Sequence, residues 1–289
     1  ERGRLDVFRP PSTIKGVCVG ENYNIFYNDK KACLFDMNSL EVLDELDSSR
    51  ISPGSAEFSF NESFVLLTGL SSSLLWDITN KTEKNIPLTK IGCSKFNNDS
   101  TEIYFGRTRG SADSLYDIEY EKEKATFNDQ TRRTSGISFH PVDQFLVCTV
   151  GWDRNINLID TRNGKVVFNI PEADSNNIKS VCFNEDYEIY AGSNSQTIKK
   201  WNLKTGGCKE SIKTKGIAVK LLCTETGHLF ANMKNNFLVI EQESKEVIYT
   251  SRKPGWTSNS SGHAICYSDN NWTLYKNVAR FSRAKSARK

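Results

Sequence analysis

The stretch from residue 151 to residue 160, GWDRNINLID, decides how the chain is interpreted. It places Trp152, Asp153, Arg154 and Asp160 close together, which raises the question of an active site. Its second half alternates apolar and polar side chains, a pattern typical of a half-buried strand. Similar runs, GISF and FLVCTV before it and KVVFNI after it, are separated by short polar turns. The stretch is therefore expected to hold the third strand of an antiparallel sheet and the turn before that strand.

The end of this stretch has relatives along the whole chain. A short apolar run closed by a polar residue occurs seven times, at intervals of 35 to 43 residues. A sustained period of about 40 residues, with four short strands in each unit, is typical of a β-propeller. The sequence therefore predicts an all-β fold, a seven-bladed β-propeller of four-stranded antiparallel blades. The closing residues are Asp36, Asp77, Asp117, Asp160, Asn202, Glu241 and Lys276.

Several short motifs indicate a family. Trp76 precedes Asp77, Trp201 precedes Asn202, and FHP at residues 139–141 follows a predicted first strand. Together with GWDRNINLID, these motifs make the chain similar to the WD-repeat β-propellers over nearly its whole length. The repeats are degenerate, because Trp76 and Asp77 form the one literal Trp-Asp mark and no unit has a clear Gly-His pair. The resemblance implies a non-enzymatic scaffold that holds other proteins in a complex through a propeller rim.

The ring of blades is expected to occupy residues 1–277, and a basic tail residues 278–289. WD-repeat propellers often close by pairing a strand from one end of the chain with a blade from the other end. Residues 5–8 are the preferred candidate for the outer strand of the seventh blade, and residues 277–281 compete for that place. If the second segment closes the ring, the first strand is a linker from a preceding domain. The tail is interpreted as a nuclear import signal, a nucleic-acid or membrane contact, or a disordered end.

Acidic residues in the predicted turns have a structural interpretation. In the resembled family, an Asp seven residues before each closing residue accepts hydrogen bonds within its turn. Asp29, Asp153 and Asp269 occupy this place and are expected to hold turns. The chain lacks the spacing of a zinc site, a phosphate loop or a nucleophile elbow. We therefore expect no catalytic residues, no cofactor and no metal.

Trp152 and Arg154 are not explained by the repeat. An exposed Trp beside an Arg is typical of a protein-binding hot spot, whereas the alternative packs Trp152 between blades and leaves Arg154 solvated. Basic residues in other turns and inter-blade loops are expected on the same rim, unless they are scattered solvated charges. Such a rim would bind other proteins, notably acidic or phosphorylated peptides, and alternatively an anionic ligand such as a phosphoinositide lipid or RNA. The predicted rim residues are Trp152, Arg154, Arg107, Arg109, Arg132, Arg133, Lys30, Lys31 and Lys234.

Composition bounds the remaining possibilities. The chain of 289 residues carries a formal net charge of +3, too small a surplus to suggest a general nucleic-acid binder. The eight cysteines form no C-x-x-C pair, and most stand among apolar residues. We interpret them as reduced core residues of an intracellular protein, nuclear or cytoplasmic. His140, which precedes a proline in a predicted turn, is expected at the surface.

Overall fold

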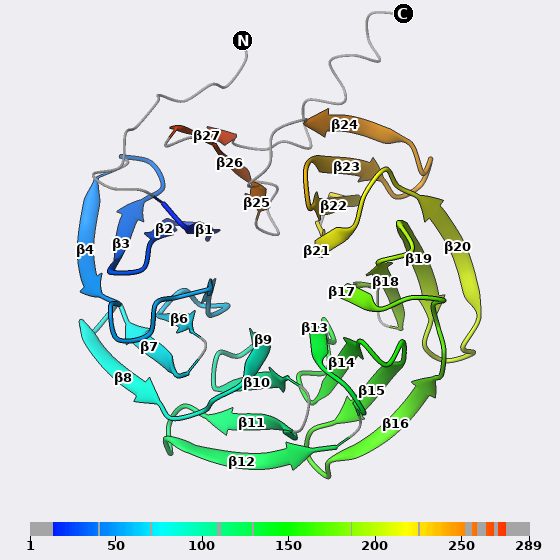
Figure 1. The fold of residues 1–289 in the computed structure, drawn as a ribbon, viewed down its shortest axis with the longest axis horizontal. Coiled ribbons are helices and arrows are strands. Elements are labelled where there is room, and N and C mark those ends of the chain that lie inside the picture. Colours follow the sequence, from blue (N-terminus) through cyan, green and yellow to red (C-terminus); the bar gives the residue numbers. More distant parts are fainter. Residues whose placement is uncertain are drawn as a thin grey trace, which may run out of the picture. The chain divides into compact units, whose positions relative to one another are not determined.

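The computed structural model describes residues 14–251, except for 40, 70, 109–110, 129, 186 and 225, together with the strands at 256–258, 264–268 and 271–275. The regular elements described are all β-strands, numbered β1 to β27 in chain order (Figure 1). The described part contains no helix long and apolar enough to cross a bilayer. Seven of the eight cysteines, from Cys18 to Cys223, are described as free thiols, six of them buried or half-buried and Cys208 exposed.

Six sheets have four strands each, and within each sheet the strands follow one another in chain order. The first two contain β1 (Gly16–Val19), β2 (Tyr23–Tyr27), β3 (Lys31–Asp36) and β4 (Val42–Asp47), then β5 (Ser55–Phe58), β6 (Phe64–Thr68), β7 (Ser73–Asp77) and β8 (Thr82–Ile86). The next two contain β9 (Ile91–Phe96), β10 (Glu102–Arg107), β11 (Asp113–Asp117) and β12 (Lys122–Phe127), then β13 (Thr134–Phe139), β14 (Leu146–Gly151), β15 (Ile156–Asp160) and β16 (Lys165–Ile170). The last two contain β17 (Ile178–Glu185), β18 (Glu188–Ser193), β19 (Thr197–Asn202) and β20 (Cys208–Lys213), then β21 (Ala218–Cys223), β22 (His228–Met233), β23 (Phe237–Glu241) and β24 (Val247–Ser251).

The prediction of seven four-stranded blades is wrong. The structure is an all-β propeller with six blades of four strands, and β25 (Trp256–Ser258), β26 (Ala264–Ser268) and β27 (Asn271–Tyr275) form a three-stranded sheet. The repeated sequence mark shows where the third strand of each unit ends, so it carries no information on whether a fourth strand pairs with that unit. Residues 5–8 and 277–281, the two segments expected to supply that strand, lie outside the described residues, as does the tail at 278–289.

The repeated polar marks have a common physical cause. The closing residues from Asp36 to Glu241 each end the third strand of their blade. Asp77 Oδ1 accepts hydrogen bonds from the backbone amides of Thr79 and Asn80 at 3.0 and 2.9 Å. Asn202 Oδ1 likewise accepts from the amides of Lys204 and Thr205. A short acceptor side chain satisfies turn amides that have no strand partner, and this explains why a polar residue recurs there.

Apolar side chains from neighbouring blades interdigitate. The blades β13–β16 and β17–β20 share a core that includes Val150, Leu158, Ile178, Val181 and Trp201. In both blades the second strand is almost wholly buried, whereas the fourth strand is mostly exposed. Burial of one sheet face against the next is the main stabilising contribution in this fold.

The chain divides into two compact units. One comprises Glu1–Phe58, Glu62–Pro87 and Leu222–Lys289, and the other comprises Ser59–Asn61 and Leu88–Leu221. We call the second one the central unit. It contains the blades β9–β12, β13–β16 and β17–β20, whose first strands are innermost and fourth strands outermost in Figure 1.

Candidate functional site

Each blade of the central unit has two distinct edges. Because its strands are antiparallel and paired in chain order, the turns between second and third strands share one edge with the connections to adjacent blades. We call this the inter-blade edge. The turns between first and second strands, and between third and fourth strands, lie at the opposite edge. A ligand of the propeller surface meets one edge or the other.

Trp152 lies at the inter-blade edge, in the turn between β14 and β15, and is 36% exposed. Two cations cover its ring. Lys179 Nζ, from β17 of the next blade, is 4.4 Å from the ring centre, and Arg133 Cζ, from the connection before β13, is 5.6 Å away. Trp152 thus touches the neighbouring blade and keeps an exposed part. The structure brings together two of the predicted rim residues, Trp152 and Arg133, and adds Lys179, which sequence reasoning missed.

Burial and neighbouring charge affect both cations of this cluster. Partial burial, and then the positive charge of Arg133, lower the pKa of Lys179. Arg133 Nη2 donates to the carbonyl of Gly92 in the preceding blade at 3.3 Å, while its Nε is buried without a hydrogen-bond partner. Among the described residues, no carboxylate pairs with either cation. The cluster therefore carries uncompensated positive charge beside an exposed aromatic ring.

The other predicted rim residues are placed differently. Arg107 folds inward, donates to the carbonyl of Thr89 at 2.6 Å and pairs with Glu123. Arg154 pairs with Glu172 at 2.6 Å. Arg132 is exposed and makes no ion pair with a described residue, whereas Arg109 lies outside the described residues. The rim residues Lys30, Lys31 and Lys234 are exposed on the unit that contains β1–β4, and Lys31 pairs with Glu45 at 2.7 Å.

The predicted turn acids make different contacts. Asp153 Oδ2 accepts from the amide of Thr131 at 3.0 Å, and its Oδ1 accepts from the amide of Asn155 at 3.2 Å. Asp29 pairs instead with Lys15, and the amides of its turn donate to Oδ1 of Asn28. Asp269 lies outside the described residues. Asp153 therefore joins its turn to the preceding connection.

Asp174 is a buried acid that the sequence reasoning did not single out. The blade β17–β20 has Ser195 where the blade β13–β16 has Asp153. Asp174, in the connection before β17, accepts a hydrogen bond from Ser195 Oγ at 2.7 Å and pairs with Lys199 at 2.9 Å. Asp174 thus places a carboxylate against the turn from outside it. The sequence held one signal for this contact: Ser195 stands where an Asp is expected, so a turn without its own carboxylate needs an acceptor from another segment.

The opposite edge of the central unit is apolar at its most exposed points. Phe60 is 76% exposed, Tyr120 66% and Val142 78%, more than any other large apolar side chain described. The amide of Asn61 donates to Ser100 Oγ at 3.1 Å, and Asn98 Nδ2 donates to the carbonyl of His140 at 2.8 Å. The turns that carry Phe60 and Val142 are therefore both hydrogen-bonded to the turn between β9 and β10.

His140 anchors this edge, and the expectation of a surface histidine is wrong. The side chain is buried, with its ring 5.2 Å from that of Phe183 and 5.1 Å from that of Tyr187. Its Nδ1 accepts from the amides of Val142 and Asp143. The proline that follows His140 correctly indicated a turn. The His140 ring is nevertheless buried, because aromatic residues of the next blade pack against it.

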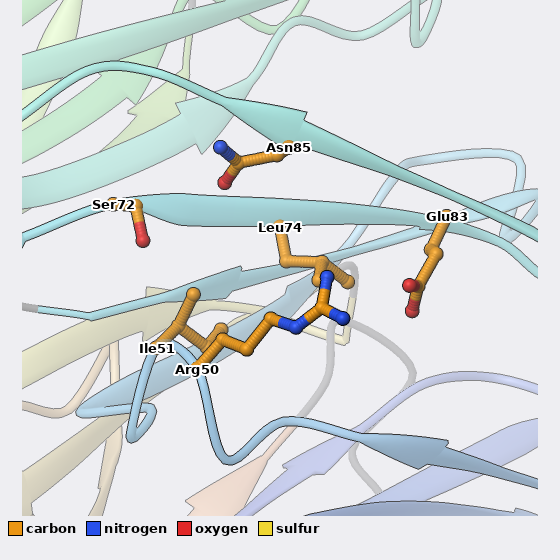
Figure 2. A pocket seen from close by; sticks show the side chains of 6 residues that line it. All are labelled: Arg50, Ile51, Ser72, Leu74, Glu83 and Asn85. Atoms are coloured by element: carbon orange, nitrogen blue, oxygen red, sulfur yellow. The ribbon is translucent and has the colours of Figure 1, made fainter.

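Two hollows add to these surfaces. An open groove of about 500 Å³ at the opposite edge is lined by residues that include Asn98, Val142, Phe145 and Arg162. A smaller hollow of about 320 Å³ lies in the other unit, and Figure 2 shows Arg50 and Glu83 entering it beside Leu74. Ser72 and Asn85 complete its polar lining. Within the described residues, no cluster of His, Cys, Asp or Glu suits a metal ion.

Comparison with known proteins bears on the family. No protein-family model matches the chain. Over 219 residues it is 27% identical to the tRNA (guanine-N(7)-)-methyltransferase non-catalytic subunit wdr4 of Dictyostelium discoideum. The chain resembles the WD-repeat β-propellers in both sequence and fold.

This WD-repeat-like match is partial. It covers 66% of the chain and 46% of the relative, so the chain spans about half the length of the curated protein that it matches. The relative is a non-catalytic subunit of a methyltransferase. A WD-repeat fold with exposed edges fits a scaffold role, because rigid blades can present loops without assembling a reactive group.

Proposed function

We propose that this chain is a non-enzymatic scaffold, an intracellular subunit of a multiprotein complex that binds its partners through a propeller rim. More specifically, we propose that it serves a complex that methylates tRNA, beside a separate catalytic subunit. The single observation that carries this proposal is the similarity to a non-catalytic methyltransferase subunit. We further propose that residues 1–277 act as one propeller and that residues 278–289 form a basic tail.

The opposite edge is the surface that we propose for the protein partner. Exposed aromatic and aliphatic side chains are typical of protein-binding hot spots, and Val142 also lines the groove at this edge. Phe60 and Val142 stand on turns that are each hydrogen-bonded to the turn between β9 and β10. Because these turns are held by hydrogen bonds, little ordering entropy is lost when a partner binds.

Affinity purification of the full chain from its native source, followed by mass spectrometry, tests this function. The expected result is a stable set of co-purifying subunits that includes a methyltransferase and retains methylation activity on tRNA. A chain that purifies without any stoichiometric partner would contradict the scaffold role. A stable complex without a methyltransferase would contradict only the specific assignment.

A further inference from the structure

The cluster of Trp152, Arg133 and Lys179 is built at the junction of two blades. Arg133 comes from the connection before β13, and Lys179 is the second residue of β17. Both cations face one indole ring, and no described carboxylate pairs with them. Two like charges that share a partly buried position repel each other, so an anion that bridges them would be bound favourably.

Further cations occur at the same edge of successive blades. Lys90 lies in the connection before β9, Arg132 in the connection before β13 and Lys215 in the connection before β21. All three are exposed, belong to the central unit and make no ion pair with a described residue. With Arg133 and Lys179, they place positive charge at the start of four consecutive inner strands.

The described acids at this edge already make contacts; Asp129, in the connection before β13, lies outside the described residues. Asp153 accepts amide hydrogen bonds, Glu172 pairs with Arg154, and Asp174 pairs with Lys199. Asp113 accepts from the amide of Arg107 and from Thr134 Oγ1. Glu172 and Asp174 therefore neutralise Arg154 and Lys199, whereas Asp153 and Asp113 keep their negative charge. The five cations of the row outnumber these two acids, so the described part of the edge carries a surplus of positive charge.

We propose that the inter-blade edge of the central unit binds the phosphate backbone of RNA, with one phosphate bridging Lys179 and Arg133 beside Trp152. Single cations on successive blades match a chain of singly charged phosphates better than one acidic side chain of a protein. An exposed aromatic ring among cations is also typical of nucleic-acid surfaces. This inference rests on the proposed function, in which the complex acts on tRNA, and it assigns protein and RNA to opposite edges.

Binding of an unmodified tRNA transcript to the purified full chain and to the purified complex tests the proposal. The affinity is measured by fluorescence anisotropy over a series of salt concentrations. Lys179→Gln removes a half-buried ammonium group that makes no hydrogen bond to a described residue, and Arg133→Gln/Lys179→Gln removes both bridging charges. The matched control is Lys122→Gln/Lys165→Gln, which removes two exposed cations from β12 and β16.

The expected effect of Lys179→Gln is a loss of RNA affinity of about three- to tenfold, with the slope of log affinity against log salt reduced in magnitude by about 1. The double variant should lose more, and the control should match the unmodified chain. An unchanged affinity and salt slope in both cluster variants would overturn the proposal. Equal losses in the control would also overturn it, because they would indicate binding without a preferred edge.

The co-purifying subunits of each variant separate this proposal from the proposed function. If the cluster variants lose their protein partners, the edge is a protein interface and the RNA assignment is wrong. If the unmodified chain captures no partner, the scaffold role fails, while the RNA measurement on the full chain still decides the role of the inter-blade edge.

Discussion

Lys179 holds its ammonium 4.4 Å from the centre of the Trp152 ring, although the two residues belong to different blades. The turn between β14 and β15 is thereby attached to the first strand of the next blade. The contact has a structural part, which joins the blades, and an exposed part, which a ligand can reach. These two parts can be measured separately.

The structural part predicts an energetic coupling between the two side chains. A double-mutant cycle with Trp152→Ala and Lys179→Met should give a coupling free energy of about 0.5 to 2 kcal/mol, the range for a partly desolvated cation–π pair. Urea unfolding of the four proteins measures it. A coupling indistinguishable from zero would show that the ring and the ammonium do not interact in solution.

The buried acid Asp174 predicts an asymmetric response to substitution. Asp174→Asn should lower the free energy of unfolding by about 2 kcal/mol, because Lys199 loses its charged partner and Ser195 a charged acceptor. Ser195→Asp should also destabilise the fold, since a second carboxylate would stand 2.7 Å from the first, at the present hydrogen-bond position. Thermal and urea unfolding provide the measurements.

The exchanged variant Asp174→Ser/Ser195→Asp is the control for this prediction. It keeps one carboxylate and one hydroxyl in contact but exchanges their positions. The carboxylate then lies in the turn between second and third strands, as Asp153 does in the neighbouring blade. Its stability should exceed that of Ser195→Asp alone. A double variant less stable than both single variants would contradict the account of a shared acceptor.

The lowered pKa of Glu188 predicts that the stability of the fold depends on pH. Hydrogen bonds from Lys200 and Lys209 hold the pKa of Glu188 below its ordinary value. A carboxyl whose pKa is lower in the folded state stabilises the fold above its unfolded pKa of about 4.3, and that contribution disappears as the pH falls through the folded pKa. Glu188→Gln should therefore lose stability at neutral pH and show a shallower further loss under acid. Unfolding midpoints measured from neutral to acidic pH test this; parallel curves would contradict it.

Substitution of the exposed apolar side chains is expected to weaken partner binding without changing the stability of the fold. Phe60→Ser/Val142→Ser should change the free energy of unfolding by no more than about 0.5 kcal/mol, because both side chains are mostly solvated. The same variant should weaken capture of the protein partner by about tenfold or more if these residues are hot spots. Quantitative pull-down with an equally conservative change on an outer strand, Val167→Ser, is the comparison. Equal capture by both variants would place the partner elsewhere.

The ends of the third strands could be predicted from the sequence because they depend on local chemistry. Asp36, Asp77, Asp117 and Asp160 end third strands because their oxygens accept amides within the next few residues. A turn requires such an acceptor wherever it lies in the fold. The alternation of buried and exposed side chains in the strands is local for the same reason.

Partners contributed by another blade could not be predicted in this way. Lys179 is separated from Trp152 by the whole of β15 and β16, and the ring of His140 packs against Phe183 and Tyr187 from the following blade. The number of strands in the last sheet depends likewise on pairing between distant segments, which the period does not encode. These outcomes depend on which sheets meet face to face.

The sequence by itself determined an all-β chain of repeated antiparallel units, the positions of their third strands and the resemblance to WD-repeat propellers, because hydrophobic period and turn chemistry act over a few residues. Only the tertiary structure decided which cations remain uncompensated. Arg107 and Arg154 found carboxylate partners, whereas Arg133 and Lys179 met at one indole ring. The physical reason is that compensation of a charge depends on distance in space, and blade packing brings together residues that the chain keeps far apart.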